Sequence, residues 1–146
     1  MDRKDRQILA LLERNARLGY GEIGKAVGLA GSSVHDRVRK LEKQGIVKGY
    51  RAEVDFEAAG LPITAIVSLA LRPASPADIP AKVAEFELVE SCYSVAGDNS
   101  YALVVRAPST KDLEELLDAL RAKLEVVTRS TVVLSTPFQH RPMLRG

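Results

Sequence analysis

The sequence predicts an α+β protein that is built from two different parts. Apolar residues recur at helical spacing through the first 44 residues, whereas from residue 63 onwards they alternate with a period of two, as in strands. Gly60 and Pro62 punctuate the segment between the two patterns. We therefore expect a helical domain over 1–50, an exit strand and linker over 51–62, an α+β domain over 63–136 and a tail over 137–146.

The first helix is expected to begin after Asp2, because Asp5 follows three residues later at the spacing of a capping box. Gly19 is expected to end this helix. Its buried stripe is predicted to consist of Ile8, Leu9, Leu12 and Ala16.

Two further helices are predicted over about 21–27 and 32–44, with Gly28 breaking the first and Gly45 stopping the second. This spacing is typical of a helix-turn-helix motif, here over about 21–44. Val34, Val38 and Leu41 give the second of these helices one apolar face. The residues left on its outer face are Ser32, Ser33, His35, Asp36, Arg37, Arg39 and Lys40. A helix with such a face fits the major groove, so we predict a regulator that binds double-stranded DNA.

Ser32 and Ser33 stand at the start of this helix, where hydroxyl groups and free amides hold a phosphate. Simple helix capping is the alternative interpretation of these two serines. Arg37, Arg39 and Lys40 are long cations that reach either a guanine edge or a backbone oxygen, and the sequence does not choose between the two.

His35 and Asp36 occupy groove-facing positions early in the helix and are the candidates for base readout. For Asp36, an intrahelical pair with Arg39 or Lys40 is the competing interpretation. No metal site is expected at His35, because no partner ligand stands four residues away on either side.

The second half of the chain is predicted to follow the order strand, helix, strand, strand, helix, strand, which is that of a ferredoxin-like split βαβ unit. Asp78 and Ser109 are the expected N-caps of its two helices. The predicted elements are strands over 63–71, 89–95, 101–106 and 126–134, helices over 75–86 and 109–124, and a turn over 97–100.

Charge is distributed unevenly along the 146 residues. Residues 1–50 carry eleven Lys and Arg against six Asp and Glu, a net charge of +5, whereas residues 51–146 carry ten against thirteen, a net charge of −3. A cationic head on an acidic body suits a protein that binds a polyanion, although chance clustering of solvated charges gives the same numbers.

Several classes of protein are disfavoured by the composition. The sequence has no apolar run of 18 residues, and its beginning lacks the apolar core of a secretion signal, so we expect a cytoplasmic protein. Cys92 is the one cysteine, which excludes an internal disulfide and a cysteine-based zinc site, and its place in a strand predicts a packed thiol. We expect no metal and no cofactor.

Motifs along nearly the whole chain match a known pattern. They are D-x-x-D-x-x-I-L from Asp2, N-A-R over 15–17, V-G-L over 27–29, R-V-x-K-L-E-x-x-G-I-V over 37–47, Gly49-Tyr50, and Gly97-Asp98 with Tyr101. With these motifs the sequence resembles the Lrp/AsnC, or feast/famine, family of prokaryotic transcription regulators. The resemblance implies a winged helix-turn-helix head on a ferredoxin-like effector and oligomerisation domain. It also implies dimers that assemble further, often to octamers, and a response to amino acids.

The sequence departs from the family pattern in two places. Family members usually have Ser-Pro where this chain has Ala30-Gly31, and an Ala cap costs roughly 1 kcal/mol, so Ser32 is expected to cap the helix instead. The family turn usually reads Gly-Asp-x-Asp-Tyr, whereas Ser100 replaces the second acid here. This second departure bears on the ligand more than on the fold.

The resemblance implies an effector site where the turn of residues 97–101 meets a neighbouring dimer, with Thr131 nearby. For an amino acid, Asp98 would accept from the ammonium group, the amides of Gly97 and Asn99 would donate to the carboxylate, and Ser100 would add a hydroxyl group. The alternative is that residues 97–100 form only a hairpin turn next to Tyr101.

Self-association is expected because a four-stranded sheet with two helices leaves one face uncovered, and the apolar residues of the first strand require cover there. The segment over 49–54 is the expected place for two chains to lie together.

Catalysis finds little support, since the chain has two histidines, one cysteine and no paired carboxylates in a predicted cleft. One alternative is an enzyme of the same architecture, similar to tetrapyrrole decarboxylases, for which the available groups are His140, Arg72, Arg106 and Arg129. Another alternative is a protein that compacts DNA with little sequence preference.

Overall fold

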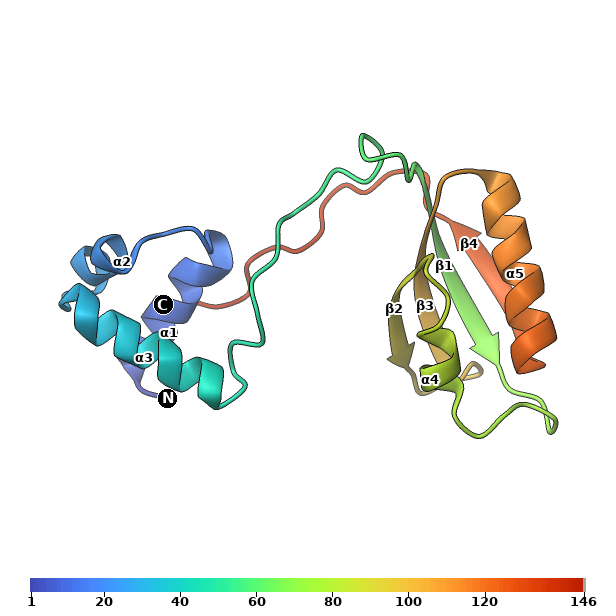
Figure 1. Ribbon diagram of the computed structural model, residues 1–146, viewed down its shortest axis with the longest axis horizontal. Coiled ribbons are helices and arrows are strands. Elements are labelled where there is room, and N and C mark those ends of the chain that lie inside the picture. The colour runs from blue at the N-terminus through green and yellow to red at the C-terminus, as the bar shows by residue number, and fades with distance from the viewer. Residues whose placement is uncertain (146) are drawn as a thin grey trace. The chain divides into compact units, whose positions relative to one another are not determined.

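The computed structural model describes residues 1–145 and divides into two compact units, each with a hydrophobic core of its own (Figure 1). The N-terminal unit comprises Met1–Glu53 together with the chain from Pro137 onwards, and the C-terminal unit comprises Val54–Thr136. None of the helices within residues 1–145 is long and apolar enough to cross a membrane.

Three helices form the N-terminal unit: α1 (Arg3–Arg14), α2 (Tyr20–Val27) and α3 (Gly31–Lys43). The predicted capping box of α1 is confirmed, because the Asp2 carboxylate accepts a hydrogen bond from the Asp5 amide at 2.8 Å and the Asp5 carboxylate accepts one from the Asp2 amide at 2.9 Å. The core of this unit brings one face of each helix together: Ile8, Leu12, Ile23, Val27, Val34 and Val38.

The predicted ends of these helices need two corrections. Helix α1 stops at Arg14 rather than near Gly19, because Asn15 adopts extended backbone angles and its side chain accepts a hydrogen bond from the Arg17 amide at 3.0 Å, so that Ala16 is exposed instead of buried. Helix α3 begins one residue before its predicted start, with Ala30 as N-cap. Ser32 therefore lies inside the first turn and does not cap the helix.

The C-terminal unit is a four-stranded antiparallel sheet in the order β2-β3-β1-β4, which confirms the ferredoxin-like arrangement. Its strands are β1 (Ile63–Ala70), β2 (Val89–Ser94), β3 (Tyr101–Ala107) and β4 (Val127–Val132). Helices α4 (Ile79–Val83) and α5 (Thr110–Leu124) start after Asp78 and Ser109, as predicted, although α4 ends earlier than residue 86.

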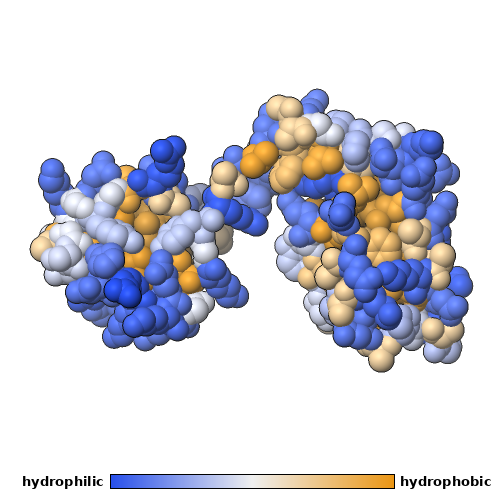
Figure 2. Space-filling view, viewed as in Figure 1, coloured by the Kyte–Doolittle hydropathy of each residue, from blue (hydrophilic) through white to orange (hydrophobic). Residues whose placement is uncertain are grey.

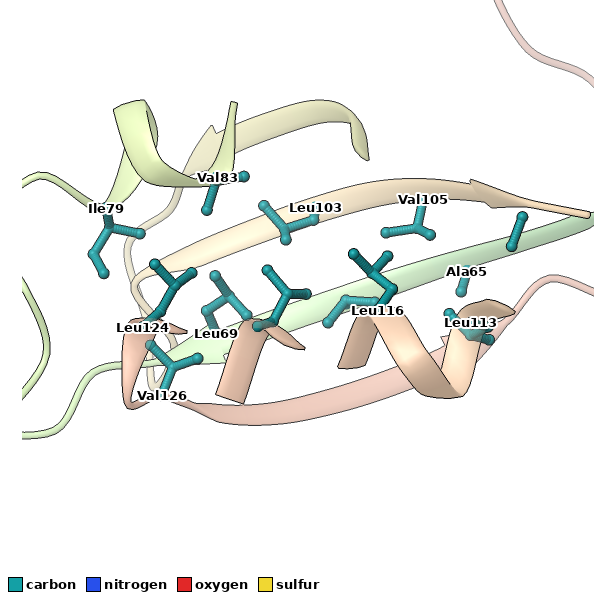
Figure 3. Packing of buried hydrophobic residues seen from close by; sticks show 13 residues of the cluster. Ala65, Leu69, Ile79, Val83, Leu103, Val105, Leu113, Leu116, Leu124 and Val126 are labelled. Atoms are coloured by element: carbon teal, nitrogen blue, oxygen red, sulfur yellow. The ribbon is translucent and has the colours of Figure 1, made fainter. Parts of the chain in front are cut away.

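One face of this sheet is covered and the other is open. Apolar side chains of α4 and α5 pack on the covered face against alternate residues of β1 and β3, including Leu69 and Leu103 (Figure 3). On the opposite face, Ile66 of β1 is 46% exposed and Tyr93 of β2 is 57% exposed. We refer to this second surface as the open sheet face.

Residues 51–62 form turns and irregular backbone and no strand, so the predicted exit strand is not found in this chain. A strand needs a hydrogen-bonded neighbour, and the single chain provides none there. The tail contacts α1: the Glu13 carboxylate accepts hydrogen bonds from the amides of Met143 and Leu144 at 2.9 and 2.7 Å.

Candidate nucleic-acid interface and effector turn

Helix α3 has one buried and one exposed face, in the register that the sequence predicts. Val34, Val38 and Leu41 are at most 2% exposed. Among the seven predicted contact residues, all but one are exposed: Ser32, Ser33, His35, Asp36, Arg39 and Lys40. Hydrophilic side chains cover much of this side of the N-terminal unit in Figure 2. The result is a continuous polar helix surface with cations at its C-terminal half.

The turn before α3 is tight because it is built from small residues. Gly28 ends α2 in the left-handed conformation, with φ of 70°. A Cβ atom on Gly24 would collide with the carbonyl oxygen of Leu29, and one on Gly31 would lie 3.3 Å from the amide nitrogen of Gly21. Helices α2 and α3 thus approach closely at their N-terminal ends, which fixes the direction in which α3 leaves the turn.

The N-terminus of α3 presents unoccupied donors. The N-cap is Ala30, so no side chain accepts a hydrogen bond from the first-turn amides. Ser32 and Ser33 are exposed beside these amides. Free amides, two hydroxyl groups and the positive end of the helix dipole together suit an anionic oxygen.

Arg37 is the exception on the outer face. Its Nη1 atom donates to Asp2 Oδ2 at 2.6 Å and to Asp5 Oδ1 at 2.7 Å, and its side chain is only 32% exposed. The expectation that Arg37 projects outward is therefore wrong, because two carboxylates at the start of α1 hold the guanidinium against that helix. The capping-box motif alone gave no sign of this third partner.

His35 and Asp36 lie beside each other on the exposed surface. His35 Nδ1 is 3.7 Å from the Asp36 carboxylate, and the His35 ring is tilted against the ring of Tyr20 with 5.3 Å between centroids. Across residues 1–145, Asp36 forms no ion pair with Arg39 or Lys40. Both cations consequently stay available to a ligand.

The candidate effector turn is a compact hairpin. The Ser100 amide donates to the carbonyl oxygen of Leu69 at 2.9 Å, and the Ser100 carbonyl accepts from the Val95 amide at 3.0 Å. Gly97 adopts φ of 146°, and Asp98 is exposed whereas Asn99 is half-buried. The Asp98 carboxylate is thus presented to solvent at the tip of the turn.

Two of the proposed effector residues do not lie together in one chain. Tyr101 pairs with Leu69 and packs with the core on the covered face, whereas Thr131 pairs with Ile66 and lies on the open sheet face. Alternation of side chains therefore places Tyr101 and Thr131 on opposite sides of the sheet. Both residues lie on the strands that the sequence predicts. The sequence did not reveal the pairing register, which places the two side chains on opposite faces of the sheet.

The groups available for catalysis are divided between the two units. His140 belongs to the N-terminal unit, whereas Arg72, Arg106 and Arg129 belong to the C-terminal unit. Cys92 is exposed on the edge strand β2 rather than packed, and partial desolvation raises the pKa of its thiol. No cluster of three or more metal-ligating side chains occurs among the residues that the structure describes.

Sequence reasoning named Arg106 only as a possible catalytic group and missed its contacts on the open sheet face. Arg106 is 12% exposed, donates to Thr64 Oγ1 at 2.7 Å, lies 3.4 Å from a Glu90 oxygen and covers the ring of Phe56. A charged residue at an alternate position of an otherwise apolar strand was the available signal.

Comparison with known proteins gives matches over both units. Residues 1–42 match the AsnC-type helix-turn-helix domain and residues 64–143 match the Lrp/AsnC ligand binding domain. The chain is 42% identical over 142 residues to the HTH-type transcriptional regulator LrpA of Mycobacterium tuberculosis, covering 97% of this chain and 95% of that protein.

Two similar solved structures are complexes with L-methionine. A feast or famine regulatory protein from M. tuberculosis complexed with L-methionine is 41% identical, with 99% of each chain covered and a TM-score of 0.94. A transcriptional regulator from Neisseria meningitidis in complex with L-methionine is 28% identical, with 98% of this chain and 96% of that chain covered and a TM-score of 0.90.

Proposed function

The chain belongs to the Lrp/AsnC family of transcriptional regulators, and we propose that the exposed face of α3 is the surface with which it recognises double-stranded DNA. The observation that carries this proposal is the division of α3 into a buried apolar face and an exposed face of serines and cations. A helix of this kind, preceded by a tight turn, enters the major groove with its N-terminal half.

The residues of this face divide into two roles. Ser32 and Ser33, with the free amides of the first turn, bind a backbone phosphate and fix the register of the protein on the duplex. His35 and Asp36 reach base edges, while Arg39 and Lys40 provide contacts to guanine or to phosphate. The protein acts in the cytoplasm by binding rather than by catalysis.

Binding by one small head is weak, so we propose that two copies act together. Their open sheet faces cover each other, because in the single chain Ile66 and Tyr93 leave apolar side-chain surface in contact with water. Two heads separated by about 34 Å read successive half-sites of a pseudo-palindrome. Further assembly, for example to an octamer, builds on this dimer.

The DNA-binding test uses a duplex that the purified protein itself selects from a random-sequence library. Arg39→Met is expected to weaken binding to it and to reduce the slope of log K against log salt concentration by about 0.9 if Arg39 neutralises one phosphate. Lys111→Met is the matched control, because Lys111 is an exposed cation on α5 in the other unit. Equal affinity for an unrelated duplex would favour the DNA-compacting alternative, and no affinity for any duplex would refute the proposal.

The dimer test replaces a residue on the open sheet face. Ile66→Arg is expected to shift the molecular mass measured by light scattering to that of the monomer, because a cation would be buried without a partner. Ala119→Arg, at an exposed position of α5, is the control that should leave the mass unchanged. A dimer that survives Ile66→Arg would place the interface elsewhere.

We further propose that the turn of residues 97–101 binds an amino acid, with Asp98 accepting hydrogen bonds from its ammonium group. The exposed Asp98 carboxylate and the L-methionine complexes of the two similar proteins support this role. Because Tyr101 and Thr131 lie on opposite sheet faces, residues of a neighbouring copy must complete the site.

Calorimetry with L-methionine tests the effector site. Ser100→Asp restores the second acid of the family turn and is expected to strengthen binding, whereas Asp98→Asn is expected to weaken it. Absence of heat with both the wild-type protein and Ser100→Asp would mean that the turn has no role in binding L-methionine.

A further inference from the structure

Arg37 joins the recognition helix to the N-terminus of the chain. One nitrogen of its guanidinium, Nη1, donates to both Asp2 and Asp5, which belong to the cap and the first turn of α1. The Asp5 side chain is only 12% exposed, so this carboxylate is largely removed from water. The three side chains, which we call the α1–α3 clamp, span the junction between these two helices and join residues 35 and 32 positions apart in the sequence.

Each carboxylate of the clamp accepts two hydrogen bonds, one from a backbone amide and one from Arg37. Asp2 accepts from the Asp5 amide and from Arg37, and Asp5 accepts from the Asp2 amide and from Arg37. The capping box of α1 and the bonds that hold Arg37 therefore use the same two carboxylates, through different oxygen atoms. Since Arg37 is near the middle of α3, the clamp restrains the middle of the helix that carries the DNA-facing residues.

We propose that Arg37 is a positioning residue, which sets the placement of α3 through Asp2 and Asp5 and does not itself contact DNA. This inference rests on the proposed DNA-binding function of α3. It follows from the restraint on the guanidinium: two carboxylates bind Nη1 and offset the positive charge, so extending the side chain outward toward a phosphate or a base would break both bonds. The neighbouring Arg39 and Lys40 are exposed and face no such cost.

The direction in which Asp2→Asn changes the affinity for DNA distinguishes a positioning role of Arg37 from direct contact with DNA. Asp2→Asn removes a negative charge from the DNA-binding unit, which by simple electrostatics tightens the binding of DNA. It also weakens the hold on Arg37, and if Arg37 contacted DNA, this release would tighten binding further. Positioning predicts the reverse, namely weaker binding after loss of the acid.

The experiment measures affinity for a duplex selected by the wild-type protein, at several salt concentrations and well below the thermal unfolding midpoint of every variant. Asp2→Asn is suitable because asparagine caps a helix as well as aspartate does, so α1 remains capped. Glu22→Gln is the matched control: it removes the carboxylate that accepts a hydrogen bond from the Gly19 amide at the start of α2, and it leaves the clamp intact.

We expect Asp2→Asn to lose on the order of tenfold in affinity with an unchanged salt slope, and Glu22→Gln to bind as tightly as the wild type or slightly more tightly. In the wild-type background, Arg37→Met should reduce the affinity for the duplex about as much as Asp2→Asn does. In a variant that already carries Asp2→Asn and Asp5→Asn, Arg37→Met should reduce the affinity little further. Arg37→Lys should recover part of the affinity, since an ammonium group can donate to both carboxylates.

Tighter or equal binding by Asp2→Asn would overturn the inference, as would a fall of about 0.9 in the salt slope for Arg37→Met. These outcomes leave the proposed function of α3 intact, because the wild-type protein would still bind its duplex. Failure of the wild-type protein to bind any duplex would instead refute the proposed function.

Discussion

The guanidinium carbon of Arg106 lies 4.3 Å from the centroid of the Phe56 ring. Arg106 belongs to β3, and Phe56 belongs to a short turn that precedes β1, in which the Leu61 amide donates to the Phe56 carbonyl oxygen at 2.8 Å. The Thr64 hydroxyl group and Glu90 hold the guanidinium in place. The segment that leads into the sheet is thus attached to one end of the open sheet face by a cation–π contact.

Phe56→Ala should release this turn from the sheet. A cation–π contact with a largely buried arginine contributes about 1–2 kcal/mol, so the amides of Ala59 and Leu61 should exchange with solvent on the order of tenfold faster. Hydrogen exchange measured by NMR checks this. As a control, Phe138→Ala removes the ring under Arg141 and should leave the exchange rates of the Ala59 and Leu61 amides unchanged. If these amides exchange in Phe56→Ala as slowly as in the wild type, the backbone hydrogen bonds alone hold the turn.

Acid should weaken the junction of α1 and α3 in a defined pH range. Hydrogen bonds from Arg37 and then from the Asp5 amide lower the pKa of Asp2 from 3.8 to about 2. A lowered pKa means that Asp2 stabilises the folded state above about pH 4 and that this contribution disappears as the pH falls through 2. The NMR chemical shift of the Asp2 carboxyl carbon, followed against pH, should show a midpoint near pH 2 in the wild type and a higher midpoint in Arg37→Met. An unchanged midpoint would show that the hydrogen bond from the Asp5 amide is the main cause of the lowered pKa.

Much of the fold followed from periodicity and caps. The apolar spacing of α5 and the alternation of β1 placed both elements correctly, and Asp2, Asp78 and Ser109 marked the starts of their helices. Helix ends were harder to predict, because Asn15 stops α1 through a local turn that competes with helical backbone. The spacing of apolar residues indicates which face of a helix is buried, but it says little about the residue at which the helix ends.

The site residues could be predicted only as far as one helix determines them. The exposed face of α3 follows from its own sequence, whereas the position of Arg37 depends on two carboxylates that lie 35 and 32 residues earlier in the sequence. In the same way, the separation of Tyr101 from Thr131 depends on strand register. Interactions between residues far apart in sequence leave no local pattern, so single-sequence reasoning cannot find them.

The start of α3 can be stabilised by one substitution. Ala30 is the N-cap with backbone angles of −67° and 147°, which are suitable for a capping side chain, but it has no oxygen to accept a hydrogen bond from the first turn. Ala30→Ser should therefore raise the free energy of unfolding of the N-terminal unit by about 1 kcal/mol. Thermal unfolding followed by circular dichroism measures this change. Ser109→Ala, which removes the cap of α5, should destabilise the other unit by a similar amount, and a neutral Ala30→Ser would mean that the new hydroxyl group does not reach the amides.

The tail provides a last prediction, because one exposed carboxylate holds it. Glu13 accepts hydrogen bonds from the Met143 and Leu144 amides, one to each carboxylate oxygen, and these two bonds lower its pKa below the usual value. Docking of the tail should therefore be complete above the ordinary pKa of a glutamate, near 4.5, and should be lost as the pH falls through the lowered value.

Glu13→Gln should release the tail at neutral pH, since an amide side chain offers one acceptor and turns a donor toward the second backbone N–H group. We expect faster exchange of the Met143 and Leu144 amides by a factor of roughly five to ten, because both amides lose the charged acceptor that protects them from solvent. Glu114→Gln, at an exposed position on α5, is the control with no expected effect on these amides. If the two amides exchange at the wild-type rate in Glu13→Gln, then side-chain packing of the tail rather than the Glu13 carboxylate holds it against the N-terminal unit.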